Sequence, residues 1–233
     1  MIRIDRQSFF AGFRAAFGKL AQSQVVGLET LLGFIEADPL PDMRWIAYLL
    51  ATIKHECADT WMPIEERGQR SYFDKYESGT KIGKVLGNTQ PGDGYLFRGR
   101  GYDQLTGRNN YLTLGDLLGV DLVGNPDLAK VPLTAYQIAC VGMAKGLFTG
   151  KKLVDYINST GTDWVNARRV INGTDRAELI AGYARSFHAM LRASPAPTDA
   201  QVGQVDTQSR GDYERLASAV RRSIDELQKA LAA

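Results

Sequence analysis

The sequence predicts a mainly helical domain with one small loop-rich or β lobe beside it. Three observations lead to this fold class. Apolar residues recur three or four positions apart through residues 5–56, which is the spacing of an amphipathic helix. Glycines and tyrosines crowd residues 61–101 and leave little room for a long helix there. Helical spacing then returns near residue 109 and continues, with short breaks, to residue 193.

Three helices are expected before the glycine-rich stretch. Asp5 is suited to cap a first helix, which carries phenylalanines at positions 9, 10, 13 and 17. Ser23 can cap a second helix, and the proline-containing run 38–42 ends it. Asp42 can cap a third helix that begins near Met43. One face of this third helix holds Trp45, Leu49, Thr52 and Glu56. A carboxylate therefore ends an otherwise apolar face.

The rest of the chain predicts more helices and one linker. Breaks are expected at residues 124–126 and 131–132, and helices over residues 134–148, 151–157, 163–172 and 175–193. The run SPAPT opens a linker over residues 194–209. We expect residues 1–193 to form one domain and residues 210–233 to form a closing helix that packs on it. The apolar stripe of that helix is Leu216, Val220, Ile224, Leu227 and Leu231.

Composition excludes several classes of protein. The 233 residues carry 28 Lys and Arg against 26 Asp and Glu, a net charge of +2, and 44% are hydrophobic. Such values are typical of a globular domain and exclude a disordered tail, a collagen-like chain and a disulfide scaffold. The near-neutral charge predicts no nucleic-acid partner, and no apolar run approaches the roughly 20 residues that span a bilayer. We expect a monomer without stable membrane insertion.

The N-terminus and the cysteines predict where the chain is made. Charges interrupt the first apolar stretch and no small-residue cleavage site follows it, so we expect no signal peptide. Cys57 and Cys140 lie in the runs HECAD and IACVG, which are typical of buried, reduced thiols. These features predict synthesis in a cytoplasm.

Glu56 is the first candidate for chemistry. A carboxyl group at the end of an apolar face is poorly solvated when charged, and this favours the protonated form that a general acid needs. Cleavage of a glycosidic bond requires a second carboxylate, which activates water or attacks the sugar. Glu65 follows an apolar turn nine positions later, which is suited to hold it over a cleft. The spacing alone leaves Glu66 and Glu77 open as alternatives.

The run RGRGYDQLTGRNNY, residues 98–111, combines features that suit a sugar. Its three glycines allow close backbone approach, and Tyr102 and Tyr111 offer flat faces for stacking. Neutral hydrogen-bonding groups come from Gln104, Thr106, Asn109 and Asn110. Composition alone is equally compatible with a glycine-rich turn before a helix.

These residues carry a family resemblance. His55-Glu56, Glu65, the run GDGYLFRGRGYDQLTGRNNY and the later run ARRVING resemble glycoside hydrolase family 19, and more closely its phage and prophage endolysins. The resemblance covers roughly residues 44–192. It implies a lysozyme-like α+β fold, in which a helical domain and a small loop-rich or β lobe flank a catalytic cleft.

The resemblance also implies roles for individual residues. Glu56 matches the general acid, Glu65 the second carboxylate, and Thr106 the hydroxyl that helps to hold the attacking water. The expected substrate contacts are Gln104, Asn110, Tyr111 and Asn172. The chain departs from the family pattern at residues 57–60, where two glycines are common, at Asp103, which replaces an aliphatic residue, and at Thr174, which replaces a glycine.

The resulting prediction is a muramidase-type endolysin. Such an enzyme cleaves the β-1,4 bond between N-acetylmuramic acid and N-acetylglucosamine in peptidoglycan, with inversion, after release from the host cytoplasm to the cell wall. The alternatives are a chitinase and a catalytically inactive wall-binding module. No cofactor is implied, and two histidines are too few for a histidine-based metal site. Residues 146–152 lack the spacing of a phosphate loop. The pair Arg168-Arg169 could belong to a helix-turn-helix DNA binder, but no basic stripe accompanies it, so this alternative is weak.

Overall fold

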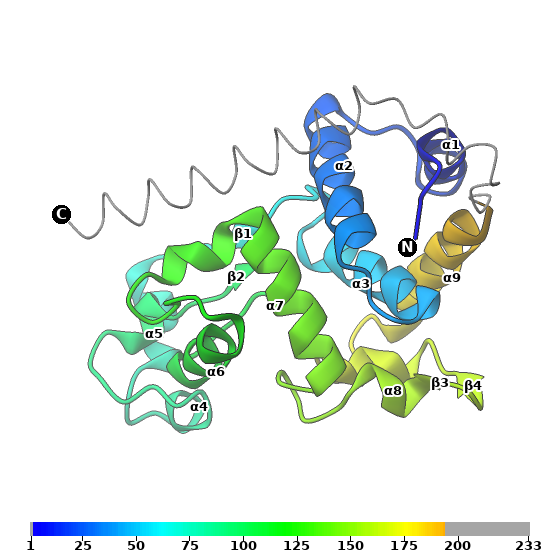
Figure 1. Ribbon diagram of the computed structural model, residues 1–233. Helices are drawn as coiled ribbons and strands as arrows, with labels where there is room; N and C mark the ends of the chain where they lie inside the picture. Colours follow the sequence, from blue (N-terminus) through cyan, green and yellow to red (C-terminus); the bar gives the residue numbers. More distant parts are fainter. Residues whose placement is uncertain (1, 194–233) are drawn as a thin grey trace. The chain divides into compact units, whose positions relative to one another are not determined.

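The computed structural model describes residues 2–193, and the expected linker and closing helix lie outside the described residues. The fold is mainly helical, as predicted, with two short two-stranded antiparallel sheets (Figure 1). The α-helices are α1 Arg6–Phe17, α2 Gln22–Ala37, α3 Met43–Glu56, α4 Lys81–Val85, α5 Asp93–Leu96, α6 Arg108–Leu118, α7 Pro132–Lys145, α8 Leu153–Tyr156 and α9 Ala177–Ala193. The 3-10 helices are η1 Arg70–Tyr76, η2 Pro126–Lys130 and η3 Asn166–Val170, and the strands are β1 Ile64–Glu65, β2 Arg100–Gly101, β3 Ile157–Asn158 and β4 Gly161–Thr162.

The starts of the first three helices follow local capping chemistry. The Asp5 side chain accepts a hydrogen bond from the Ser8 amide (2.7 Å) at the start of α1, and Asp42 accepts one from the Arg44 amide (2.8 Å) at the start of α3. Both caps confirm the prediction. The cap predicted at Ser23 is wrong, because α2 begins at Gln22, one residue earlier. There the Gln24 side chain accepts from the Ala21 amide (2.7 Å) and takes over the capping role.

The larger core surrounds α3, which is buried on all sides from Ile46 to Lys54 and packs along α9. Aromatic rings fill the space where α1 meets α9. The Phe187 ring lies 5.1–6.3 Å, centroid to centroid, from four other rings: Phe9, Phe13, Phe17 and Trp61. This packing holds the carboxyl end of α3, and with it Glu56, on a rigid support.

The glycine-rich stretch forms the predicted loop-rich lobe. It contains η1, α4 and α5, and its two-stranded sheet pairs Ile64 with Gly101 and Glu65 with Arg100. A second, smaller core lies under this lobe and includes Phe97, Tyr111 and Leu114. Helix α7 lies between the helical part and the loop-rich lobe, and it contacts α2 on one side and α6 and β2 on the other (Figure 1).

The segment after α7 differs in detail from the prediction. A helix was expected over residues 163–172, and the structure has only the 3-10 helix η3 at Asn166–Val170. The hairpin of β3 and β4 was not predicted, since each of its strands has two residues and no alternating pattern can show in so short a run. Helix η3 packs on α8 and on α9, which places Arg168 beside the end of α3.

The sequence predicted no membrane-spanning helix and two reduced cysteines, and both points concern residues 2–193. No helix in that range is long and apolar enough to cross a bilayer. Cys57 and Cys140 are both free thiols; Cys57 is buried and Cys140 is partly buried.

The contact between α2 and the loop after α3 can be tested at Gly27. A Cβ on Gly27 would lie 2.5 Å from the carbonyl oxygen of Trp61, and that backbone cannot swing away as a side chain can. Gly27→Ala should therefore lower the free energy of unfolding by about 1–3 kcal/mol in urea titrations. Gly182→Ala is the matched control: no described residue lies within 4 Å of its Cβ, so it should stabilise α9 by up to about 1 kcal/mol. Equal effects at both glycines would contradict this packing.

Candidate active site

Glu56 ends α3 and is paired with an arginine. Nη1 of Arg168, in η3, donates a hydrogen bond to Oε1 of Glu56 at 2.6 Å. The Arg168 side chain is 3% exposed and its Nε donates to the Asp175 carbonyl (3.1 Å), so the guanidinium is fixed from both sides. The Glu56 side chain keeps 19% of its surface exposed. A carboxyl group that is mostly enclosed but still reachable is suited to proton transfer with a bound molecule.

A second carboxyl group, Asp103, lies buried close to Glu56. Both of its oxygens are inaccessible, and neither has a hydrogen-bond partner among the described residues. Burial, and after it the charge of Glu56, raises the pKa of Asp103 to about 8, while the Arg168 charge acts in the opposite direction. Asp103 is therefore neutral over much of the range in which an ordinary aspartate is ionised.

The face of α3 that leads to Glu56 is more polar than the sequence suggested. Tyr48 and Thr52 precede Glu56 on the same face at intervals of four residues. The Tyr48 hydroxyl and the Thr52 Oγ1 are buried, and neither has a hydrogen-bond partner among the described residues. Burial raises the pKa of the Tyr48 phenol, so this group stays neutral. The Glu56–Arg168 pair thus lies at the end of a buried polar strip within the helical core.

Glu65, the predicted second carboxylate, lies in the loop-rich lobe and is held by three cations. It sits on β1 directly across from Arg100 on β2, and its Oε1 is 3.2 Å from Nη2 of Arg100. Arg98 forms a second ion pair with the same oxygen, and Nζ of Lys130 lies 3.5 Å from Oε2. The Glu65 side chain is 28% exposed. These cations fix the direction of its carboxylate.

Tyr111 supports these arginines and is not at the surface. Its side chain is fully buried, and its hydroxyl donates to the Arg98 carbonyl (2.9 Å) and accepts from Nη1 of Arg100 (3.2 Å). The ring predicted to contact substrate is therefore packed beneath Glu65 in this structure. Tyr102, the other ring of the motif, is also buried. Tyr95 instead lies against Arg98, whose guanidinium carbon is 3.9 Å from the ring centroid.

The tight turn between Arg100 and Leu105 joins the two carboxylate centres. The backbones of these two residues hydrogen-bond to each other in both directions (2.8 and 3.1 Å), and Gly101 and Gln104 take positive φ values of 89° and 55°. Consecutive side chains diverge in such a turn. Asp103 lies buried near Glu56, whereas Nε2 of Gln104 donates to the Ile64 carbonyl (3.2 Å), next to Glu65.

The remaining motif residues continue from this turn. The Thr106 hydroxyl donates to the Gln104 carbonyl (2.8 Å), and Nδ2 of Asn110 donates to the Thr106 carbonyl (2.8 Å). The structure thus brings Gln104, Thr106 and Asn110 together beside the strand of Glu65. Asn172 lies apart from them, in an exposed turn after η3, and its Oδ1 accepts from the Gly173 amide (2.8 Å).

The alternative second carboxylates have other partners. Glu77 accepts a hydrogen bond from the Gly92 amide (2.8 Å), which ties η1 to the loop before α5. Glu66 accepts from the Tyr76 hydroxyl and from the Gly99 amide, both at 3.2 Å. Within residues 2–193 neither has an arginine partner, whereas Glu65 has two. The ion pairs with arginine thus distinguish Glu65 from the two alternative carboxylates.

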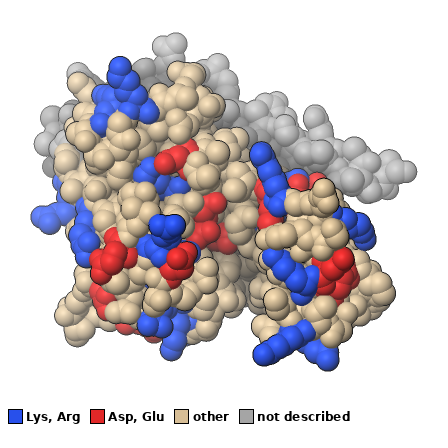
Figure 2. All heavy atoms as spheres, turned by 180° about the vertical axis from the view of Figure 1, so that it is seen from behind, with Lys and Arg blue, Asp and Glu red and all other residues tan. Residues whose placement is uncertain are grey.

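A hollow separates the helical part of the molecule from the loop-rich lobe. Figure 2, which views the molecule from behind, shows this hollow with acidic atoms on both of its sides. Glu56 belongs to the helical part and Glu65 to the loop-rich lobe. A long, thin polymer is the kind of molecule that such an open groove can accommodate.

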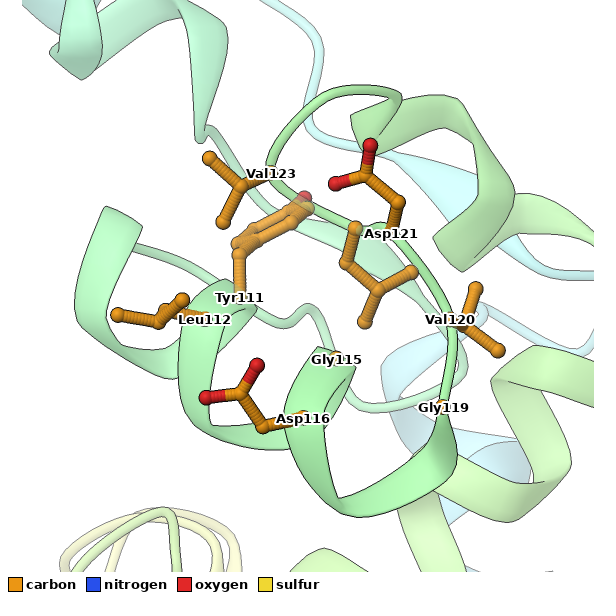
Figure 3. A pocket seen from close by; sticks show the side chains of 9 residues that line it. Tyr111, Leu112, Gly115, Asp116, Gly119, Val120, Asp121 and Val123 are labelled. Carbon is orange, nitrogen blue, oxygen red and sulfur yellow. The ribbon is translucent and has the colours of Figure 1, made fainter.

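Two pockets lie elsewhere among the described residues. One, of about 360 Å³, is formed by α6 and the turn after it, and Gly115, Asp116 and Asp121 are among its lining residues (Figure 3). The other, of about 430 Å³, lies at the β3–β4 hairpin and includes Trp164. Neither pocket contains Glu56, Glu65 or Thr106.

Sequence reasoning missed two residues of this site. Arg168 was weighed only as a possible DNA contact, and nothing local in the sequence links it to Glu56, from which it is 112 positions away. Asp103 was noted only as a departure from the family pattern. The signal that could have found it is a charged residue between Tyr102 and Leu105, both of which are buried.

Comparison with known proteins points to chitinases. No family model matches the chain. Over 34 residues it is 62% identical to Chitinase 8 of Oryza sativa subsp. japonica; this stretch is 15% of the chain and 13% of the length of that relative.

Solved structures show a likeness over most of the chain. Chitinase C from Streptomyces griseus HUT6037 matches with a TM-score of 0.54 and 20% identity over 81% of this chain and 78% of that one. A chitinase C mutant matches with a TM-score of 0.55 and 19% identity, over 84% of this chain and 95% of that one. A bacterial family 19 chitinase matches with a TM-score of 0.50 and 18% identity, over 84% of this chain and 98% of that one. The chain therefore has the fold of the family 19 chitinases. This likeness confirms the predicted fold class of a helical domain with a small loop-rich lobe.

The burial of Asp103 predicts a pH-dependent stability. Its pKa is raised from 3.8 to about 8, so folding favours the protonated form; that contribution is complete below pH 4 and is lost as the pH rises through 8. Asp103→Asn removes the titration. Its free energy of unfolding relative to the parent should rise by a few kcal/mol between pH 4 and pH 8, since one pKa unit corresponds to about 1.4 kcal/mol. Urea unfolding across this range measures the difference, with exposed Asp116→Asn as control. Parallel curves for the parent and Asp103→Asn would contradict this environment.

Proposed function

We propose that this protein is a glycoside hydrolase that cleaves β-1,4 bonds between N-acetylated sugars, and that its substrate is peptidoglycan. The observation that carries the proposal is the pair of arginine-bound carboxylates, Glu56 from the helical part and Glu65 from the loop-rich lobe. Each is partly exposed, and one tight turn places Gln104 against the strand of Glu65 and Asp103 within the electrostatic influence of Glu56. Two carboxyl groups with different electrostatic surroundings are what acid and base roles in glycoside cleavage require.

In the proposed mechanism Glu56 donates a proton to the glycosidic oxygen as the bond to the leaving sugar breaks. The carboxylate that remains is stabilised by Arg168, whose guanidinium already lies 2.6 Å from it. Glu65, held in place by its cations, orients a water molecule and receives its proton as the water attacks the opposite face of the sugar, which inverts the anomeric centre. Thr106 supplies a further hydrogen-bonding group to that water.

Two polymers are candidate substrates, and different observations favour each. The run RGRGYDQLTGRNNY resembles phage and prophage endolysins, which favours peptidoglycan and a role in lysis of the host cell. The relatives with known names are chitinases, which makes chitin the second candidate. Turbidity clearing of purified peptidoglycan, run beside release of reducing ends from chitin, discriminates between them. Binding of either polymer without product release would indicate a wall-binding module instead.

The acid role of Glu56 gives the first activity prediction. Glu56→Gln keeps the shape of the side chain and removes the transferable proton, so the rate of clearing should fall at least about 100-fold. Glu178→Gln changes an exposed carboxylate in α9 and should keep the parental rate. Circular dichroism checks that both variants fold. A Glu56→Gln protein that clears walls at the parental rate would exclude Glu56 as the acid.

The proposed water-holding role of Thr106 gives the second activity prediction. Thr106→Ala should lower kcat more than it raises KM, because placing the attacking water matters mainly in the transition state. Steady-state kinetics on a soluble glycan fragment separate the two constants. A change in KM alone would make Thr106 a sugar contact rather than a partner of the water.

A further inference from the structure

The pocket at the β3–β4 hairpin has no role in the mechanism above. It holds about 430 Å³, and its walls come from the end of α8, the hairpin, the turn into η3 and Arg185 on α9. A volume of this size is typical of pockets that bind small molecules. Two aromatic residues, Tyr156 and Trp164, line it together with the carboxylates of Asp155 and Asp163. A hollow that combines flat rings with separate polar groups is suited to bind a ligand.

The hairpin that forms one wall of the pocket is fixed to the start of α3. Nη1 of Arg44 donates a hydrogen bond to Oγ1 of Thr162 (2.8 Å), and Nε1 of Trp45 donates to the Ile157 carbonyl (2.8 Å). Both bonds reach from a helix of the main core to the hairpin. The wall is therefore formed before a ligand binds, which lowers the entropic cost of binding.

The Trp164 ring is fixed in place yet stays partly exposed. It stacks on the Tyr48 ring, with the centroids 6.3 Å and the planes 13° apart, and its centroid lies 5.7 Å from that of the His188 ring. Its indole N–H has no hydrogen-bond partner within residues 2–193, and neither has the Tyr156 hydroxyl. Such rings offer a ligand an apolar surface and a donor at its edge. Sugars match both, because they carry C–H faces as well as hydroxyl and acetamido oxygens.

The charged groups of the pocket favour a neutral ligand over an anion. The Arg185 guanidinium is exposed and has no acidic partner within residues 2–193. Two carboxylates outweigh it: Asp155, and Asp163, whose pKa is held below its usual range by hydrogen bonds from Asn166. A carboxylate oxygen accepts more than one hydrogen bond, so both groups can also bind hydroxyls. The excess of negative charge disfavours phosphate groups, which are bound by unpaired cations.

We propose that this pocket is a second glycan-binding site, which holds one or two N-acetylated sugars of a β-1,4-linked polymer without cleaving them. The identity of the polymer rests on the proposed function. Glu56 and Glu65 are both absent from the pocket lining. Tyr48, on which Trp164 stacks, precedes Glu56 by eight residues, which is about 12 Å along α3. One insoluble polymer particle can therefore be held at both places, and this raises the effective concentration of glycan at the groove.

The indole N–H of Trp164 provides a direct probe of the pocket. The chain has three tryptophans, and of these only Trp164 lines the pocket. In the full chain labelled with ¹⁵N and carrying Glu56→Gln, so that no sugar is consumed, the Trp164 indole signal is the one missing after Trp164→Phe. Titration with the N-acetylglucosamine tetramer should shift this signal and reach saturation.

Arginine variants test whether that shift comes from the pocket. Arg185→Ala should weaken the binding seen at Trp164 at least about threefold, because a charged hydrogen bond to the sugar is lost. Arg14→Ala, which changes an exposed arginine in α1, is the matched control and should leave the binding curve as it is. No shift with millimolar tetramer, or the same curve in Arg185→Ala, overturns the inference. A shift produced by a lysine-containing wall peptide but not by the tetramer assigns a peptide ligand and also overturns it.

Activity gives an independent readout. Arg185→Ala should slow the clearing of insoluble peptidoglycan about threefold to tenfold and should keep kcat/KM on a soluble fragment of the same polymer within about twofold, because a short fragment gains nothing from a second hold. Arg14→Ala should leave both rates at the parental level. An equal loss on both substrates would assign Arg185 an effect on the groove itself and overturn the inference.

The outcomes separate this inference from the proposed function. A parent protein that hydrolyses neither peptidoglycan nor chitin overturns the proposed function, while the Trp164 titration still decides whether the pocket binds sugar. An active enzyme whose Trp164 signal does not respond to the tetramer keeps the proposed function and overturns the second site.

Discussion

The ion pair between Glu56 and Arg168 is the constraint on which the site depends. Glu56 ends a long buried helix, where the helix dipole disfavours negative charge. The Arg168 guanidinium offsets this at 2.6 Å, and it is itself fixed by the Asp175 carbonyl. The fold must therefore bring η3 back against the end of α3. The packing of α9 on both elements does so, and it gives the helical part its main structural role.

The turn between Arg100 and Leu105 fixes the geometry of the loop-rich lobe, as the Glu56–Arg168 ion pair fixes the end of α3. It aligns Arg100 with Glu65 across two short strands and places Asp103 near Glu56. Such short strands have little stability of their own. Their geometry comes from the buried Arg100, from Arg98 and from the Tyr111 hydroxyl that bonds to both, so a motif suited by composition to bind sugar is also the structural centre of its lobe.

Features set by local chemistry could be predicted from the sequence, and features set by long-range contacts could not. The caps at Asp5 and Asp42 depend on neighbouring amides, and the glycine-rich lobe depends on composition. Glu56 and Glu65 were recognisable from an apolar face and from a motif. Their arginine partners were not, because an ion pair across 112 residues leaves no local pattern. Tyr111 was predicted as a sugar contact although its ring is buried, because its burial depends on how the lobe folds over it and not on the motif itself.

Helix α7 has a further consequence for the energetics of the two lobes. The Phe148 ring that follows it packs against both hydrophobic cores and lies directly over Gly142, where a Cβ would come within 2.2 Å of the ring. One side chain therefore belongs to both cores. Loosening of either core removes contacts from the other, so the two lobes are joined in one cooperative unit. A substitution in either core, far from the groove, is therefore expected to change the width of the groove between the lobes.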